Sequence, residues 1–199
     1  MNPHAATFET YYQGNDDPWG FRSRFYEKRK RDLLLASLPQ ERFGSCWEIG
    51  CSNGELAASL AERCDQMLAT DGNERAVSLA HDRLAHLSHA RVKQSWVPGD
   101  WPDQAFDLIV LSEVAYYLSV DDLKAFMRQL TSRLSKGGVF AACHWRASID
   151  GCELDGNGVH FLLTQSIPLH HACSHVEPDF LLDIWSWNEA SVAMEEGLR

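Results

Sequence analysis

Short apolar runs alternate with helical segments along this chain of 199 residues, and this alternation constrains the fold more than any other feature. The run at residues 108–111 is entirely apolar, as expected for a central strand buried on both faces. Further strands are expected at residues 46–49, 67–71, 91–96 and 139–145. Helices are expected at residues 24–38, 56–63, 74–87 and 121–134, the last one stopped by Gly137-Gly138. This order predicts a doubly wound α/β fold, with a mostly parallel sheet and helices on both faces.

The order changes after residue 145. A short helix near residues 159–165 is followed by two strand-like runs, at residues 169–176 and 180–187. A turn at Glu177-Pro178 separates these runs, so they are expected to form an antiparallel hairpin at one edge of a seven-stranded sheet. We expect one structural domain, in which residues 1–38 form an N-terminal segment and helix covering the active site, and residues 39–199 bind the ligand.

Composition limits the partners and the compartment. Asp and Glu outnumber Lys and Arg by 28 to 18, whereas a nucleic-acid-binding protein needs basic residues to neutralise phosphates. The 6 cysteines include no C-x-x-C pair, which indicates free thiols in a reducing compartment. Residues 1–10 lack the features of a signal peptide, and no apolar run approaches the roughly 18 residues of a membrane span. We expect a cytoplasmic protein with a small-molecule partner and no nucleic acid or membrane, of open oligomeric state.

The loop at residues 48–54 is the strongest motif. Doubly wound sheets bind ligands beyond the carboxyl ends of their strands, and this loop follows the first strand. Gly50 permits close approach of a ligand, Gly54 permits tight packing, and Asp71 ends the second strand, where its carboxylate could accept bonds from ribose hydroxyls. The loop lacks the glycine spacing of nicotinamide-binding sites, although an oxidoreductase and a plain tight turn remain alternatives. With Glu48 two positions before Gly50, the loop instead resembles that of Rossmann-like methyltransferases, which use S-adenosylmethionine (AdoMet) and release S-adenosylhomocysteine (AdoHcy). AdoMet carries positive charge and no phosphate, so an acidic residue in this loop suits it.

The wider pattern resembles a known enzyme class. Residues 106–110, residues 134–138 and the terminal hairpin are similar to class I (Rossmann-like) AdoMet-dependent methyltransferases. Residues 17–19 (Asp-Pro-Trp), 25–29 and 112–118 are similar to the nodulation protein S (NodS-like) family of N-methyltransferases, which act on a deacetylated glucosamine of a chitin oligosaccharide. Ser52 departs from the family pattern, because a glycine is usual there.

This resemblance implies a set of cofactor-binding residues. Glu48 and Gly50 would lie near the methionine part, Asp71 at the ribose, and Ser112 beyond the fourth strand. Trp96 would lie beside the adenine, or it could be plain core or apolar surface cover. In such enzymes the N-terminal segment commonly closes over the cofactor, which adds Trp19 and Arg29, although both could simply cover the sheet or face solvent. The complete expected set is Glu48, Gly50, Cys51, Gly54, Asp71, Trp96, Ser112, Trp19 and Arg29.

Methyl transfer requires an aligned nucleophile, and an amine nucleophile must first lose a proton. Glu113 and Tyr116 follow the fourth strand and His144 ends the fifth, where they face the expected pocket, so they are the candidate catalytic residues. The alternatives are a helix-capping carboxylate for Glu113 and a packing role for His144. Tyr116 and Tyr117 are adjacent and are expected to point apart, one into the core and one into the pocket.

A histidine-rich strand raises the question of a metal. His171, Cys173 and His175 alternate onto one face, and such ligands could hold zinc. Adjacent residues on one strand face crowd each other, however, and methyl transfer from AdoMet needs no metal, so no metal site is predicted. The favoured function is methyl transfer to a small polar acceptor, most simply an amine such as a deacetylated amino sugar. The alternatives are transfer to a sugar or metabolite hydroxyl, and a non-catalytic AdoMet-binding regulatory module.

Overall fold

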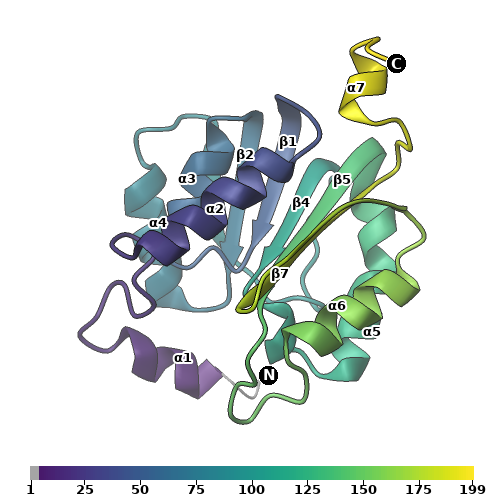
Figure 1. Ribbon diagram of the computed structural model, residues 1–199. Coiled ribbons are helices and arrows are strands. Elements are labelled where there is room, and N and C mark those ends of the chain that lie inside the picture. The colour runs from purple at the N-terminus through teal and green to yellow at the C-terminus, as the bar shows by residue number, and fades with distance from the viewer. Residues whose placement is uncertain (1–4) are drawn as a thin grey trace.

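A seven-stranded sheet lies between two layers of helices in the computed structural model, which describes residues 5–199 (Figure 1). The strand order is β3-β2-β1-β4-β5-β7-β6. The first five strands run parallel, and β7 pairs antiparallel with both β5 and β6, so the predicted fold and terminal hairpin are confirmed. The bounds are β1 (Phe43–Ile49), β2 (Cys64–Asp71), β3 (Ala90–Gln94), β4 (Phe106–Ser112), β5 (Leu134–Trp145), β6 (His170–Val176) and β7 (Phe180–Ser186). Residues 1–4 of the predicted N-terminal segment lie outside the described residues.

Two apolar cores hold the helices against the sheet. Leu108 and Val110 of β4 pack into the core beneath α2, α3 and α4, whereas Ile109 and Leu111 pack into the core beneath α5 and α6. Successive side chains of a strand point to opposite faces, so the apolar run in β4 supplies both cores at once. The helices are α2 (Phe25–Ser37), α3 (Glu55–Ala61), α4 (Glu74–Leu84), α5 (Val120–Arg133) and α6 (Gly156–Ser166). Within the described chain, no helix is both long and apolar enough to span a membrane.

The glycine pair after α5 corrects one expectation. The prediction that Gly137-Gly138 stops the helix is wrong, because α5 ends at Arg133 and β5 begins at the next residue, so both glycines lie inside the strand. The β4–β5 register shifts between Phe106 and Leu108 at this place. A Cβ atom on Gly138 would lie 2.9 Å from the Ser135 carbonyl oxygen, so the irregular strand leaves no room for a side chain there.

Three short elements are not predicted by the sequence pattern: α1 (Ala5–Tyr12), the 3-10 turn η1 (Ala115–Tyr117) and α7 (Val192–Glu195). Segments this short show no reliable apolar period. Two of them, α1 and η1, lie at the carboxyl ends of the strands. The order of the sheet reverses between β1 and β4, and in open α/β sheets this is where ligands bind.

Candidate functional site

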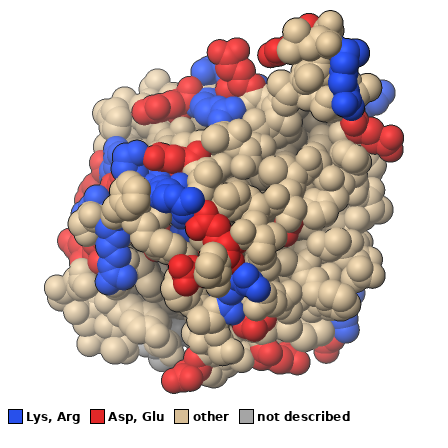
Figure 2. All heavy atoms as spheres, in the orientation of Figure 1, with Lys and Arg blue, Asp and Glu red and all other residues tan. Residues whose placement is uncertain are grey.

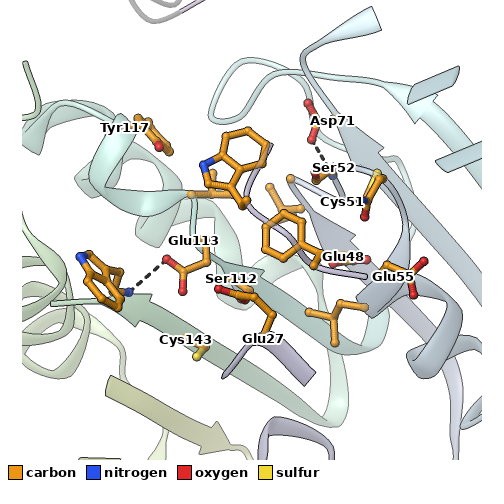
Figure 3. A pocket seen from close by; sticks show the side chains of 18 of the residues that line it. Glu27, Glu48, Cys51, Ser52, Glu55, Asp71, Ser112, Glu113, Tyr117 and Cys143 are labelled. Atoms are coloured by element: carbon orange, nitrogen blue, oxygen red, sulfur yellow. Dashed lines mark hydrogen bonds between the residues drawn. The ribbon is translucent and has the colours of Figure 1, made fainter. Parts of the chain in front are cut away.

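The carboxyl ends of β1 and β4 open onto a cavity of ≈ 560 Å³, a size typical of small-molecule sites. Its walls come from the loops after β1, β2, β3 and β4, from the end of β5, and from the N-terminal segment with α2. Acidic side chains outnumber basic ones in the lining: Glu27, Glu48, Glu55, Asp71, Glu113 and Asp179 against Arg24, Lys30 and Arg31. In Figure 3, Asp71, Ser52 and Cys51 lie toward one end of the cavity, and Glu113 and Cys143 toward the other.

The loop after β1 has the tight backbone that its sequence predicted. Gly50 has φ +78°, and a Cβ atom there would lie 2.1 Å from the Val114 side chain, so glycine allows the loop after β4 to come close. Ser52 also adopts a left-handed conformation, with φ +49°, in which a glycine would be less strained. Cys51 is buried and lines the cavity between these two residues.

Glu48 presents an unpaired carboxylate oxygen. Its side chain is 3% exposed, and Oε2 has no hydrogen-bond partner among the described residues. Burial and the nearby Asp71 charge raise the pKa of Glu48 well above its ordinary value, while the Arg31 charge acts in the opposite direction. A buried oxygen without a donor is unfavourable, so this position calls for a ligand that brings a positive charge or an N–H group.

Asp71 is fixed by the backbone around it. Its Oδ2 accepts a hydrogen bond from the Ser52 N–H and its Oδ1 accepts one from the Asn73 N–H, both at 2.9 Å. Burial raises the pKa of Asp71, and these backbone hydrogen bonds lower it. Each carboxylate oxygen accepts more than one hydrogen bond, so Asp71 retains capacity for hydroxyl donors from a ligand.

An aromatic wall stands beside Asp71. The Trp96 ring lies so close to Gly72 that a Cβ atom there would sit 2.2 Å from it. The backbone N–H of Trp96 donates to the Asp100 carboxylate at 3.0 Å, which holds this loop after β3 in place. Gly72 was not among the predicted site residues, although its position directly after Asp71 was a signal that could have found it.

The N-terminal segment closes one side of the cavity. Trp19 lines the cavity and contacts the rings of Tyr12 and Phe21, with centroid distances of 5.6 and 5.7 Å. The Tyr12 hydroxyl lies 2.7 Å from Ser52 Oγ, and the Asn53 side chain donates to Asp17 at 2.9 Å. These contacts join the N-terminal segment directly to the loop after β1.

The opposite end of the cavity is built around Glu113. This residue has φ +60°, and its Oε1 accepts from Lys30 Nζ at 2.6 Å. Its Oε2 accepts from the Tyr116 hydroxyl at 2.5 Å and from the Trp145 N–H at 3.1 Å. Ser112, at the end of β4, lines the cavity next to it.

The two adjacent tyrosines do not point apart as expected. Tyr116 and Tyr117 both line the cavity, and their ring centroids are 4.8 Å apart. The expectation applied strand geometry, in which successive side chains face opposite ways, whereas these residues lie in the turn η1. Burial raises the pKa of both hydroxyls.

Three predicted residues lie outside the cavity lining. His144 is fully buried: its Nε2 accepts the Ala115 N–H at 3.1 Å, and its Nδ1 lies 3.1 Å from His160. Burial lowers the pKa of His144, so its ring is neutral and can accept the hydrogen bond from the first residue of η1. Arg29 forms an ion pair with Glu177 in the turn between β6 and β7, at 2.7 Å. Gly54 instead allows close packing of α3 on α4, where a Cβ atom would lie 3.0 Å from the Ala80 Cα.

The histidines of β6 have other partners. His171 stacks on Trp185 and lies 2.7 Å from Asp183, while His175 lies 2.7 Å from Glu177. The β6–β7 register shifts between His171 and Cys173, which breaks the strict alternation assumed from the sequence. Over residues 5–199, no three His, Cys, Asp or Glu side chains are grouped so that they could hold a metal ion.

Three charged residues of α2 were not identified from the sequence: Glu27, Lys30 and Arg31 all line the cavity. A signal was present, because Lys30 precedes the buried Leu34 by one helical turn and so lies on the same face. A lysine on the buried face of a helix needs a partner, which here is a pair of carboxylates. Figure 2 shows charges of both signs mingled over this part of the surface.

Comparison with known proteins identifies the family. A family model described as nodulation protein S (NodS) matches residues 12–156. The chain belongs to this family. Nodulation protein S of Rhizobium tropici is 32% identical over 129 residues, which is 62% of this chain and 52% of that protein. The chain spans between 52% and 58% of the length of the first three such relatives.

Solved structures extend the comparison to the fold. N-methyltransferase NodS from Bradyrhizobium japonicum WM9, solved with S-adenosyl-l-homocysteine, has a TM-score of 0.81 and 25% identity, covering 96% of this chain and 100% of that chain. A chain from Pseudomonas syringae, solved as a candidate methyltransferase, has a TM-score of 0.74 and 47% identity, covering 82% and 99%. The fold is therefore that of the class I methyltransferases, as expected.

Proposed function

We propose that this protein is an AdoMet-dependent methyltransferase whose acceptor is the amine of a small polar molecule. The observation that supports this most directly is the unpaired, buried Glu48 oxygen in an acid-rich cavity at the switch point of the sheet. That environment favours a cofactor carrying positive charge. Membership of a family that includes an N-methyltransferase, solved with AdoHcy, supports the same reaction.

The residues present fit AdoMet. Glu48 and Arg31, together with Cys51, would hold the methionine part, because its ammonium and carboxylate need one acidic and one basic partner. Asp71 would accept bonds from the ribose hydroxyls, and the Trp96 ring would lie against the adenine. The bound cofactor supplies a methyl group on a positively charged sulfur, which makes the methyl carbon electrophilic. Trp19 and its aromatic neighbours would exclude water from one side of the site.

The acceptor would bind at the end of the cavity formed by Glu113, Tyr116 and Trp145. Two carboxylates, Glu27 and Glu113, face this region with a single lysine between them, so its charge favours a cationic amine over a neutral hydroxyl. A deacetylated amino sugar is an acceptor of this kind. Transfer to a hydroxyl is the second candidate, supported by the hydrogen-bonding capacity of Ser112 in the same wall.

Calorimetric titration with AdoHcy, with NAD as the control, tests the cofactor. We expect micromolar binding of AdoHcy and none of NAD; the reverse result, or no binding of either, would remove the proposal. Methyl transfer from labelled AdoMet to glucosamine, to N-acetylglucosamine and to simple alkylamines then tests the acceptor. Turnover of the free amines alone supports amine transfer, turnover of N-acetylglucosamine supports the hydroxyl candidate, and AdoHcy binding without turnover would indicate a regulatory module.

A further inference from the structure

A buried ionic cluster closes the acceptor end of the cavity. Lys30 Nζ lies 2.9 Å from Glu27 Oε2 and 2.6 Å from Glu113 Oε1, and it is 5.1 Å from the centre of the Tyr26 ring. The Lys30 side chain is only 8% exposed. One ammonium group between two carboxylates leaves a net negative charge, so the cluster can attract a second cation from the cavity.

Glu27 and Glu113 differ in how many hydrogen bonds their carboxylates accept. Glu113 accepts three hydrogen bonds, from Lys30, Tyr116 and the Trp145 backbone, and these fix both of its oxygens. Among the described residues, Lys30 is the donor to Glu27 and contacts its Oε2. The Glu27 side chain lines the cavity, so its second oxygen remains available to a ligand. In Figure 3 both carboxylates project into the same part of the site.

We propose that Glu27 is the proton acceptor of the reaction, and that Glu113 is a positioning residue that orients Lys30 and Tyr116. This rests on the proposed function. An N–H bond of the bound acceptor ammonium breaks, and the proton passes to a Glu27 oxygen. The electron pair left on nitrogen forms the bond to the methyl carbon, whose bond to sulfur breaks with its pair retained by sulfur. The Glu27 proton passes to water when the product leaves.

The surroundings of Glu27 suit this role. Burial and the Glu113 charge raise the pKa of Glu27, whereas Lys30 and Arg24 lower it. The net effect is a raised pKa, so this carboxyl holds a proton more tightly than an exposed one. A base with a raised pKa withdraws a proton from an ammonium group more effectively. Burial alone would lower the pKa of Lys30, but the Glu113 and Glu27 charges raise it, so Lys30 stays charged. Neutral His144 lies outside the cavity lining and is not a competing base.

The test compares Glu27→Gln with Glu113→Gln in the full chain, using glucosamine as acceptor. We expect Glu27→Gln to bind AdoHcy normally by calorimetry, to slow transfer by at least about 100-fold at neutral pH, and to make the rate rise steadily with pH, because free amine must then come from solution. Glu113→Gln should also slow transfer, but it should keep the low-pH limb of the wild-type profile. Asp32→Asn, which removes an exposed carboxylate of the same helix, should match the wild type.

A second acceptor separates proton removal from a structural role. Methoxyamine is unprotonated and therefore uncharged at neutral pH, so its nitrogen needs no base. Glu27→Gln should slow its methylation far less than that of glucosamine. Glu27→Asp, which keeps a carboxylate, should recover part of the rate. An unchanged rate and pH profile in Glu27→Gln, or equal slowing with both acceptors, would overturn the Glu27 assignment while leaving the methyltransferase proposal intact. Absence of AdoHcy binding in the wild type would instead remove the proposed function itself.

Discussion

The two ends of the cavity are built from different kinds of sequence information. Most of the proposed cofactor end comes from the loops after β1, β2 and β3, which lie between Glu48 and Trp96 in the chain, and Arg31 and Trp19 complete it. The acceptor end joins α2 to the loop after β4 and to the end of β5, so Lys30 contacts a residue 83 positions away. The first end is therefore largely encoded in one stretch of sequence, whereas the second combines segments that are distant in the sequence.

The charged side chains at the two ends of the cavity also differ in their partners. At the cofactor end, Glu48 has a buried oxygen without a described partner and Asp71 is held by backbone N–H groups, so we expect a ligand to complete the site. At the acceptor end, the protein supplies its own cation, Lys30, to two carboxylates. Substitutions at the two ends should therefore affect different measurements.

The largest effect is expected at Gly50. Gly50→Val places a branched side chain where a Cβ atom already lies 2.1 Å from Val114, at a backbone angle that strongly favours glycine. We expect AdoHcy binding to become undetectable by calorimetry, with the circular dichroism of the fold retained. In Gly50→Ala/Val114→Ala the collision is relieved but the backbone strain remains, so partial recovery is expected. Normal binding in Gly50→Val would show that the cofactor end is misplaced.

Lys30→Met should disrupt the ionic cluster at the acceptor end and leave the residues at the cofactor end in place. Removing the lysine leaves two buried carboxylates without their cation, which should lower the free energy of unfolding by about 3–5 kcal/mol in urea titrations. Because Glu27 can then protonate, the loss should be smaller at acidic pH and grow as pH rises through its raised pKa. Lys28→Met, at an exposed position of the same helix, is the control and should change stability by less than about 0.5 kcal/mol.

Asp71→Asn tests the cofactor end by removing the carboxylate charge while keeping the size of the side chain. The amide keeps the size of the side chain but weakens the charge-assisted hydrogen bonds, so AdoHcy affinity should fall by about 1.5–3 kcal/mol in calorimetry. The KM for glucosamine, measured at saturating AdoMet, should stay unchanged because Asp71 lies at the other end. A raised KM for glucosamine with normal AdoHcy affinity would reverse the assignment of the two ends.

The smallest effect is expected from Arg29, two positions before Arg31 on the same helix. Arg29→Gln removes an ion pair to Glu177, whose pKa it holds at about 2 with help from His175, and should leave AdoHcy affinity unchanged. Arg31→Gln removes a cation that lines the cavity and should weaken AdoHcy measurably. Calorimetry on this matched pair decides which arginine of α2 serves the cofactor.

The sequence predicted the sheet, and it also predicted residues that the structure places around one cavity, for physical reasons. The uninterrupted apolar run in β4 and the charged loop after β1 are local patterns, and the structure places Glu48, Gly50, Cys51, Asp71, Trp96 and Ser112 around one cavity. The residues that the sequence analysis placed wrongly or did not identify are those whose position depends on tertiary contacts. Arg29 and Arg31 differ only in which side of α2 they occupy, and His144 lies on the covered side of β5. The period of a helix predicts a buried face, but not the partner that covers it.

The contact between the N-terminal segment and the loop after β1 has a consequence for timing. Tyr12 is bonded to Ser52, and Asp17 to Asn53, so the segment rests on the very loop that would hold AdoHcy. Each such bond contributes only about 1 kcal/mol, so a few of them add a small free-energy cost to separating the segment from the loop. Under the proposed function, we expect exchange of AdoHcy for AdoMet to require that the segment first separate from this loop.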